Sequence, residues 1–153
     1  IAINKAVAEK NGSVVFYKVC GSTGCHSIVP PTLLAEKTIV PSITLDSFLQ
    51  ENDINQIDFI KIDIEGGELF AIKGMGALLS KNNGLVMVGE FFPNALASTN
   101  IQPIEFLKNM QTYGFTIYQI VKGGKLKPFS IENAKNLELH QMGSINLLFQ
   151  KDT

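Results

Sequence analysis

The stretch Asp58-Phe59-Ile60-Lys61-Ile62-Asp63-Ile64-Glu65-Gly66-Gly67-Glu68 decides how the rest of this chain is organised. It opens with an apolar run typical of a strand, continues with two carboxylates and a Gly-Gly pair, and leads into a helical pattern. In open α/β sheets, ligands sit at the carboxyl ends of strands, where the next helix begins. The stretch therefore predicts a buried strand that delivers Asp63 and Glu65 into a cleft. The alternative is a solvated turn whose acids favour the positive end of the next helix.

The composition is that of a globular protein with one domain. Of the 153 residues, 45% are apolar and 18% are charged. The net charge of −1 offers no basic stripe for nucleic acid, and no apolar run approaches the ~20 residues of a membrane span. No signal-peptide pattern opens the chain, so we expect a cytoplasmic protein. Ile1 falls inside an expected strand, which predicts that the sequence is part of a longer protein.

Two cysteines, Cys20 and Cys25, lie close to His26 in a loop rich in Gly and Ser. Together they offer three metal ligands, whereas structural zinc normally needs four, so we expect no metal site here. A disulfide across the loop is one alternative, and two reduced thiols are the other, which compartment rules favour. A single loop histidine is more often a surface residue than a base.

Strands are expected at 1–7 and 14–19, and at 38–44, where Pro41 predicts an edge strand or a bulge. The segment from about 14 to 44 is expected to form an extra hairpin. Thr44 is a predicted N-cap of a short helix. The signature strand, 57–64, has apolar residues of both parities at its start, which predicts a central strand covered on both faces.

Helical spacing after the signature predicts a helix that Gly74 and Gly76 split into two pieces. The alternation of strands and helices from here on predicts a βαβ sheet with parallel central strands. The later segments are expected as a strand at 85–92, a candidate lid at 94–100, a helix from Pro103, a strand at 115–121, an irregular segment at 131–141 and a strand at 145–150.

Three carboxylates are the candidate catalytic residues: Asp63, Glu65 and Glu90, the last at the end of the following strand. Adjacent parallel strands lie about 4.8 Å apart, so we expect the three to share one small site. Such a site could bind ammonium or hydroxyl groups of a cofactor, accept a proton from a substrate hydroxyl, or bind a hard cation. A metal-dependent hydrolase is the weaker hypothesis, because no histidine lies close in sequence. Glu68 falls in the first helical turn, where it complements the helix dipole.

The signature stretch resembles that of the FkbM-type methyltransferases, which are S-adenosylmethionine-dependent O-methyltransferases of the class I Rossmann-like fold. The resemblance implies an α/β sheet, mostly parallel with an antiparallel edge. It also implies that Asp63, with Ile64, lies beside the methionine part of the cofactor, and that Lys5, Ala6 and Val7 flank the adenine. Glu65 or Glu90 is then expected to bind the hydroxyl of a small-molecule or glycan acceptor. The other segments that resemble the family, in the same order, are 4–7, 11–17, 44–49, 88–93 and 114–118.

Two strands of the family pattern are missing from this sequence. One ends in a Gly-rich loop and the other ends in an acid that holds the cofactor ribose. In the class I fold they lie between the strand at 1–7 and the signature strand, so their absence is expected to break the sheet and expose a strand edge on each piece. Homo-oligomers could form through these edges.

The missing strands lead to two hypotheses about function. In the first, the chain is the C-terminal portion of a methyltransferase, a single partial domain over 1–153 that is inactive and binds no cofactor tightly alone. In the second, it is a non-enzymatic α/β interaction module derived from a methyltransferase. The sequence upstream of Ile1 would discriminate the two.

Overall fold

A computed structural model describes residues 2–21, 23–93, 96, 102–139 and 143–151. The chain divides into two compact units. The first comprises Ile1–Gln56 and Ile64–Leu78, and the second comprises Ile57–Asp63 and Leu79–Thr153. The signature stretch therefore contributes to both units. Apart from Leu96, the candidate lid lies outside the described residues.

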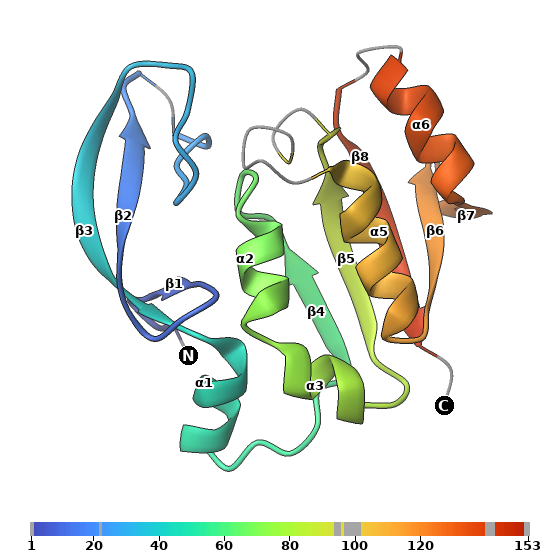
Figure 1. The fold of residues 1–153 in the computed structure, drawn as a ribbon, viewed down its shortest axis with the longest axis horizontal. Helices are drawn as coiled ribbons and strands as arrows, with labels where there is room; N and C mark the ends of the chain where they lie inside the picture. Colours follow the sequence, from blue (N-terminus) through green and yellow to red (C-terminus); the bar gives the residue numbers. More distant parts are fainter. Residues whose placement is uncertain (1, 22, 94–95, 97–101, 140–142, 152–153) are drawn as a thin grey trace. The chain divides into compact units, whose positions relative to one another are not determined.

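The first unit contains a three-stranded sheet in the order β1-β3-β2 (Figure 1). Strand β2 (Gly12–Val19) and strand β3 (Ala35–Ile43) form the expected hairpin. Every residue of β2 pairs with β3 in an antiparallel ladder. The strand expected at 1–7 is formed only as β1 (Ala6–Val7), which pairs parallel with the end of β3.

The edge position predicted from Pro41 is wrong, because β3 is the middle strand of its sheet. Strand β1 pairs only with Ser42 and Ile43. Pro41 pairs with Ser13 of β2 and lies just outside the β1 ladder. The missing N–H of proline is tolerated there because only one described strand, β2, pairs with β3 at that position.

Helix α1 (Leu45–Glu51) begins at the predicted cap. The side chain of Thr44 accepts a hydrogen bond from the backbone N–H of Ser47 at 3.0 Å. Thr44 has extended backbone angles, as an N-cap residue does. The prediction from local sequence is confirmed.

The helix after the signature is split, as predicted, into α2 (Glu68–Lys73) and α3 (Gly76–Lys81). The break is stabilised by Asp46, which the sequence did not single out for this role. Its carboxylate accepts hydrogen bonds from the N–H groups of Ala77 at 2.8 Å and Leu78 at 2.9 Å. Asp46 thus satisfies donors that the first turn of α3 leaves without helical partners.

The second unit contains a five-stranded mixed sheet in the order β4-β5-β8-β6-β7 (Figure 1). Only β4 and β5 are parallel, and the other three pairs are antiparallel. The expectation of a mostly parallel sheet is wrong, because the last strand enters between β5 and β6 and runs against both. The strands are β4 (Phe59–Ile62), β5 (Val86–Phe91), β6 (Phe115–Val121), β7 (Lys125–Pro128) and β8 (Ile145–Lys151).

The signature strand β4 lies at the edge of this sheet, not at its centre. Phe59, in its first position, is 57% exposed, whereas Ile62 is buried. The prediction of a strand covered on both faces is wrong, because β5 is the only described strand that pairs with β4. The predicted break of the sheet into two pieces is confirmed. Among the described residues, β4 and β1 each lack a strand on their outer edge.

Helix α5 (Pro103–Thr112) begins at Pro103 as predicted and packs on the second sheet. Its Phe106 stacks on Phe91 of β5, with ring centroids 6.2 Å apart, and meets Phe149 of β8 edge-on at 5.9 Å. Both neighbouring strands therefore pack on one aromatic side chain. Such aromatic pairs add about 0.5–1.5 kcal/mol each beyond the area they bury.

Helix α6 (Ile131–Leu139) replaces the irregular segment that was expected at 131–141. Ser130 starts it, because its hydroxyl accepts from the N–H of Asn133 while the Asn133 side chain accepts from the N–H of Ser130. This reciprocal pairing is a form of capping box. The prediction was wrong because it considered the polarity of the segment and missed the cap.

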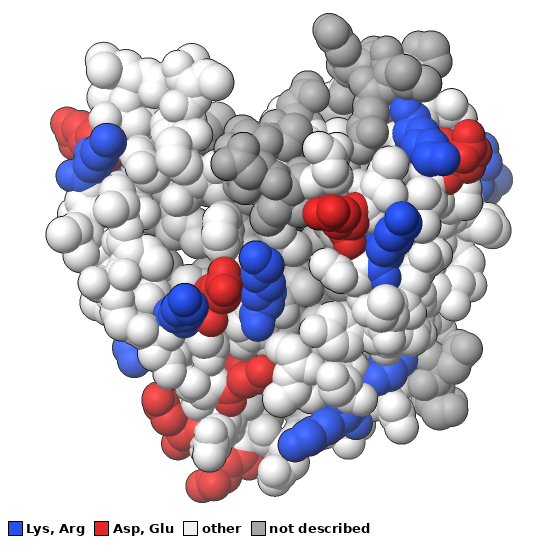
Figure 2. Space-filling view, viewed as in Figure 1, with Lys and Arg blue, Asp and Glu red and all other residues white. Residues whose placement is uncertain are grey.

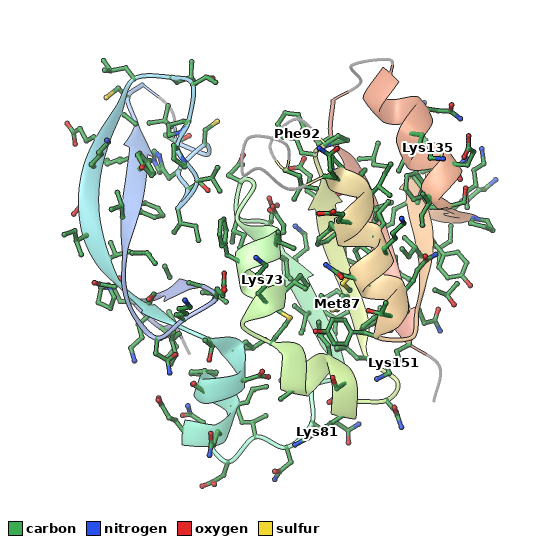
Figure 3. All side chains as sticks on the ribbon, viewed as in Figure 1. Lys73, Lys81, Met87, Phe92, Lys135 and Lys151 are labelled. Atoms are coloured by element: carbon green, nitrogen blue, oxygen red, sulfur yellow. The ribbon has the colours of Figure 1, made fainter. Side chains whose placement is uncertain are left out.

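A lysine of β8 binds carbonyl groups near the C-terminal end of α3. The ammonium of Lys151, on β8 (Figure 3), donates to the carbonyl oxygens of Leu79 at 2.8 Å and Ser80 at 3.2 Å. A cation at the C-terminal end of a helix is favourable for the dipole. Figure 2 shows lysines and acidic side chains interspersed over this unit. In the described part of the chain, no helix is long and apolar enough to cross a membrane.

Candidate functional site

Asp63 follows the last residue of β4 and lies in the second unit. Its side chain is 57% exposed and forms an ion pair with Lys61, with Nζ and Oδ2 2.8 Å apart. Residues two apart on a strand share a face, so the pair runs along the surface of β4. Asp63 is therefore a solvent-facing carboxylate, and its exposure rules out a deeply buried acid.

Glu90 lies in β5, beside the end of β4. The parallel register pairs Ile62 with Gly89. Asp63 follows Ile62 and Glu90 follows Gly89, so the two acids lie at equivalent positions along neighbouring strands. Glu90 is half-buried and is opposite Asn146 of β8 in the ladder. The two strands are parallel neighbours as predicted. The meeting of their two carboxylates stays a prediction.

Glu65 belongs to the first unit, in the turn that leads to α2. It is half-buried, and its backbone adopts φ +54°, in the left-handed region that residues with a Cβ rarely occupy. Gly66 follows at φ +89°, a value that glycine adopts without strain. Strained residues persist only where their surroundings hold them. The convergence of all three predicted carboxylates stays a prediction, since Glu65 lies in a different unit from Asp63 and Glu90.

Two buried side chains hold this turn through the backbone of Ile64. The hydroxyl of Ser27 donates to the carbonyl oxygen of Ile64 at 3.2 Å. The N–H of Ile64 donates to Oε1 of Glu68 at 3.2 Å. Ser27 and Glu68 are each 6% exposed, and both hydrogen bonds are partly buried, so water competes with them less than with hydrogen bonds at the surface. Neither residue was predicted to hold the turn. From the sequence, Glu68 was expected to complement the dipole of the helix, and no role was expected for Ser27.

Gly67 completes the turn by allowing close packing. A Cβ at this position would lie 3.3 Å from Cδ1 of Ile64 and 3.4 Å from Cγ1 of Ile28. Its N–H donates to the carbonyl oxygen of Ile64 at 3.2 Å. The backbone donor and acceptor of Ile64 are thus both used, its side chain packs beside Gly67, and its contact with a cofactor stays a prediction.

Lys5, Ala6 and Val7 lie at the start of the first sheet. Lys5 precedes β1 and is exposed, Ala6 is half-buried, and Val7 is 36% exposed. Only the edge that faces β3 is paired in the described residues. The three residues therefore present accessible surface, and their contact with adenine stays a prediction.

His26 and the cysteines are accounted for by local structure. The N–H of Val19 donates to Nδ1 of His26 at 3.1 Å, so this ring nitrogen is an acceptor that fixes the loop against β2. Cys20 and Cys25 are exposed and not joined in a disulfide, as the compartment rules favoured. In the described residues, no three side chains of His, Cys, Asp or Glu are grouped so as to hold a metal ion.

The comparison with protein families gives one match. The family model described as the methyltransferase FkbM domain matches residues 2–117. The matched range contains both sheet edges described above and the whole signature stretch. No curated protein and no solved structure matches the chain. Because the model covers more than half of the sequence, the chain belongs to the FkbM methyltransferase family.

Proposed function

We propose that this chain is the C-terminal portion of an S-adenosylmethionine-dependent O-methyltransferase that acts on a hydroxyl of a small molecule or glycan in the cytoplasm. The family match over residues 2–117 carries the proposal. The turn at Glu65 supports it, because a strained residue held by buried neighbours is characteristic of functional sites.

The predicted cofactor-binding residues have the chemistry that S-adenosylmethionine requires. Asp63 is an exposed carboxylate, suited to accept hydrogen bonds from the ammonium or hydroxyl groups of the cofactor. Val7 and Ala6 offer apolar surface for the adenine ring, beside the exposed Lys5. The bound cofactor would supply an electrophilic methyl group on its sulfonium.

The chain itself would position the acceptor and remove its proton. Methyl transfer requires that the attacking oxygen be held in line, which carries much of the rate gain, and that its proton find a base. Glu65 suits this role because the Ser27 and Glu68 contacts fix its turn. Glu90 suits it because β5 is paired on both sides, which restrains the backbone that carries the carboxylate.

The Gly-rich loop and the ribose-binding acid of the family are absent from this sequence. The outer edges of β1 and β4, which pair with no described strand, suit the two strands that would carry them. The same edges also favour the second candidate function, an α/β interaction module, because an unpaired edge can accept a strand of a partner protein.

Isothermal titration with S-adenosylmethionine separates the two functions. The full-length protein is expected to bind the cofactor, and the 153-residue chain alone is expected not to bind it at micromolar concentration. Micromolar binding by the chain alone would overturn the assignment of a missing cofactor loop. Failure of the full-length protein to bind would favour the interaction module.

The proton acceptor is tested in the full-length protein with labelled cofactor and a panel of hydroxylated acceptors. Glu65→Gln and Glu90→Gln keep the side-chain shape and remove the base. The variant at the true acceptor is expected to lose about 10²–10⁴-fold in kcat. Glu105→Gln, at an exposed carboxylate in the first turn of α5, is the matched control. Full activity in both test variants would exclude these carboxylates as the base.

A further inference from the structure

A cavity of about 410 Å³ lies within the first unit. Its wall is formed by the turn 8–11, by β2, by Ile28 and Pro30 of the following loop, and by Phe70 of α2. All of these residues belong to the same compact unit. The volume falls in the ~300–1,000 Å³ range of small-molecule sites.

The lining of the cavity combines apolar surface with a balanced pair of charges. Tyr17 and Phe70 contribute aromatic rings, and Val15, which is 42% exposed, contributes an aliphatic side chain. The charged lining residues are Glu9 and Lys10, one of each sign. Because the two charges cancel, the lining has no net charge that would attract an ion of either sign.

Hydrogen bonds fix the polar turn that closes one side of the cavity. Asn11 accepts from the N–H of Thr44 and donates to the hydroxyl of Ser47, both at 2.8 Å. The buried hydroxyl of Ser42 donates to the carbonyl oxygen of Lys10 at 2.9 Å. Such preorganisation lowers the entropy that a ligand loses on binding.

The carboxylate of Glu9 lies near a lysine of α2. Its Oε2 lies 3.8 Å from Nζ of Lys73 in a partly exposed ion pair. Lys73 is labelled on α2 in Figure 3. A carboxylate held beside an apolar wall can accept hydrogen bonds from ligand hydroxyls. The hydroxyls of Ser13 and Tyr17 are further groups of the lining that can donate or accept.

The wall of the cavity is continuous with the elements that hold the signature turn. Ile28 follows Ser27, whose hydroxyl binds the carbonyl of Ile64, and Ile28 itself packs against Gly67. Phe70 lies in α2, the helix that begins at this turn. A ligand in the cavity would therefore contact the same loop and helix that position Glu65.

We propose that this cavity is the acceptor subsite, and that it binds an uncharged ring that carries hydroxyl groups. The apolar and aromatic wall covers the face of the ring, and Glu9, Ser13 and Tyr17 bind its hydroxyls. The role of the bound ring as a methyl acceptor rests on the proposed methyltransferase function. Binding of the ring to the cavity does not require the cofactor.

The experiment measures binding to the full-length protein by saturation-transfer NMR without cofactor. The probes are methyl β-D-glucopyranoside for a sugar ring and catechol for an aromatic ring. Their charged counterparts are D-glucuronate and 3,4-dihydroxybenzoate. We expect one neutral probe to bind at least tenfold more tightly than its charged counterpart. Equal binding of each pair, or binding of none of the probes, would overturn the proposal.

Two variants that place a larger side chain in the cavity test whether the probe binds there; we call them filling variants. Val15→Phe and Ser13→Phe enlarge exposed side chains of the lining and are expected to weaken binding of the neutral probe at least tenfold. Ile39→Phe is the matched control, because Ile39 pairs with Val15 across the hairpin, is 74% exposed and does not line the cavity. If only the control variant loses binding, or if both filling variants bind the probe normally, the ligand binds elsewhere.

Methylation of the bound probe then tests its role. With labelled S-adenosylmethionine, the filling variants are expected to lower transfer to the probe in proportion to the lost binding. If the full-length protein binds the probe in this cavity but methylates no hydroxyl of any acceptor, the methyltransferase function fails while the binding site stands. If it methylates the probe equally in the filling variants, the subsite fails while the function stands.

Discussion

Glu65 has an unfavourable backbone conformation and is also a candidate proton acceptor. Its φ of +54° is shared by one other non-glycine residue among those described, Asp53 at φ +55°. Left-handed backbone costs about 1–2 kcal/mol for a residue with a Cβ. Asp53 lies at the end of α1, where its N–H donates to the carbonyl of Gln50, and a turn explains its conformation. Glu65 likewise lies in a turn, in which the N–H of Gly67 donates to the carbonyl oxygen of Ile64.

We predict that Glu65→Gly raises the free energy of unfolding by about 1 kcal/mol, because glycine adopts this φ without strain, while methyl transfer falls. Asp53→Gly is the matched control, with a similar gain in stability and unchanged transfer. The measurements are urea denaturation and labelled methyl transfer with the full-length protein. Equal activity in the two variants would mean that the Glu65 side chain has no part in the reaction.

Helix α2 makes close backbone contacts at both of its ends. Its first turn packs on Ile28 through Gly67. At its other end, a Cβ on Gly74 would clash with the carbonyl oxygen of Ala8, next to β1, and would lie 3.3 Å from Cβ of Thr44. The carbonyl of Gly74 also accepts from the N–H of Asp46. The helix therefore connects the signature turn to the end of β1.

Gly74→Ala is predicted to lower the free energy of unfolding by about 1–3 kcal/mol. The cause is the clash with the Ala8 backbone, since Gly74 has φ −81° and needs no glycine for its own conformation. Gly24→Ala is the control, because nothing lies within 4 Å of a Cβ there. Thermal or urea unfolding measures both. If Gly74→Ala were neutral, the helix would have to be free to move away from β1.

The two edges of the second sheet differ in how well they are protected against pairing with another strand. At one edge of the second sheet, β7 carries Lys125, Lys127 and Pro128, residues that discourage pairing with another strand. At the other edge, β4 carries Phe59, which is 57% exposed. An unprotected edge with an exposed aromatic residue invites association.

We predict that the 153-residue chain self-associates through β4 and that Phe59→Lys raises its apparent Kd at least tenfold, a change of about 1.4 kcal/mol. Leu126→Lys on β7 is the control, because Leu126 is similarly exposed at 48% on the edge already protected. Light scattering over a range of concentrations measures both. A mass that is independent of concentration in the unchanged chain would contradict association through this edge.

Features that depend on a few neighbouring residues could be predicted from the sequence. Thr44 caps α1, Gly74 and Gly76 divide the helix after the signature, and Pro103 opens α5. Each follows from hydrogen-bonding capacity or backbone freedom over three or four positions. Membership of the FkbM family followed in the same way, because the signature is one continuous stretch.

The sequence by itself thus determined most local elements, apart from α6 and the length of β1, together with the family and the candidate carboxylates Asp63, Glu65 and Glu90. Only the tertiary structure decided that β8 enters between β5 and β6, that β4 lies at an edge, and that Ser27 holds the backbone of Ile64. The reason is physical. Strand order and the Ser27 contact join residues tens of positions apart, and the free energy of such pairings depends on which surfaces the rest of the chain leaves available.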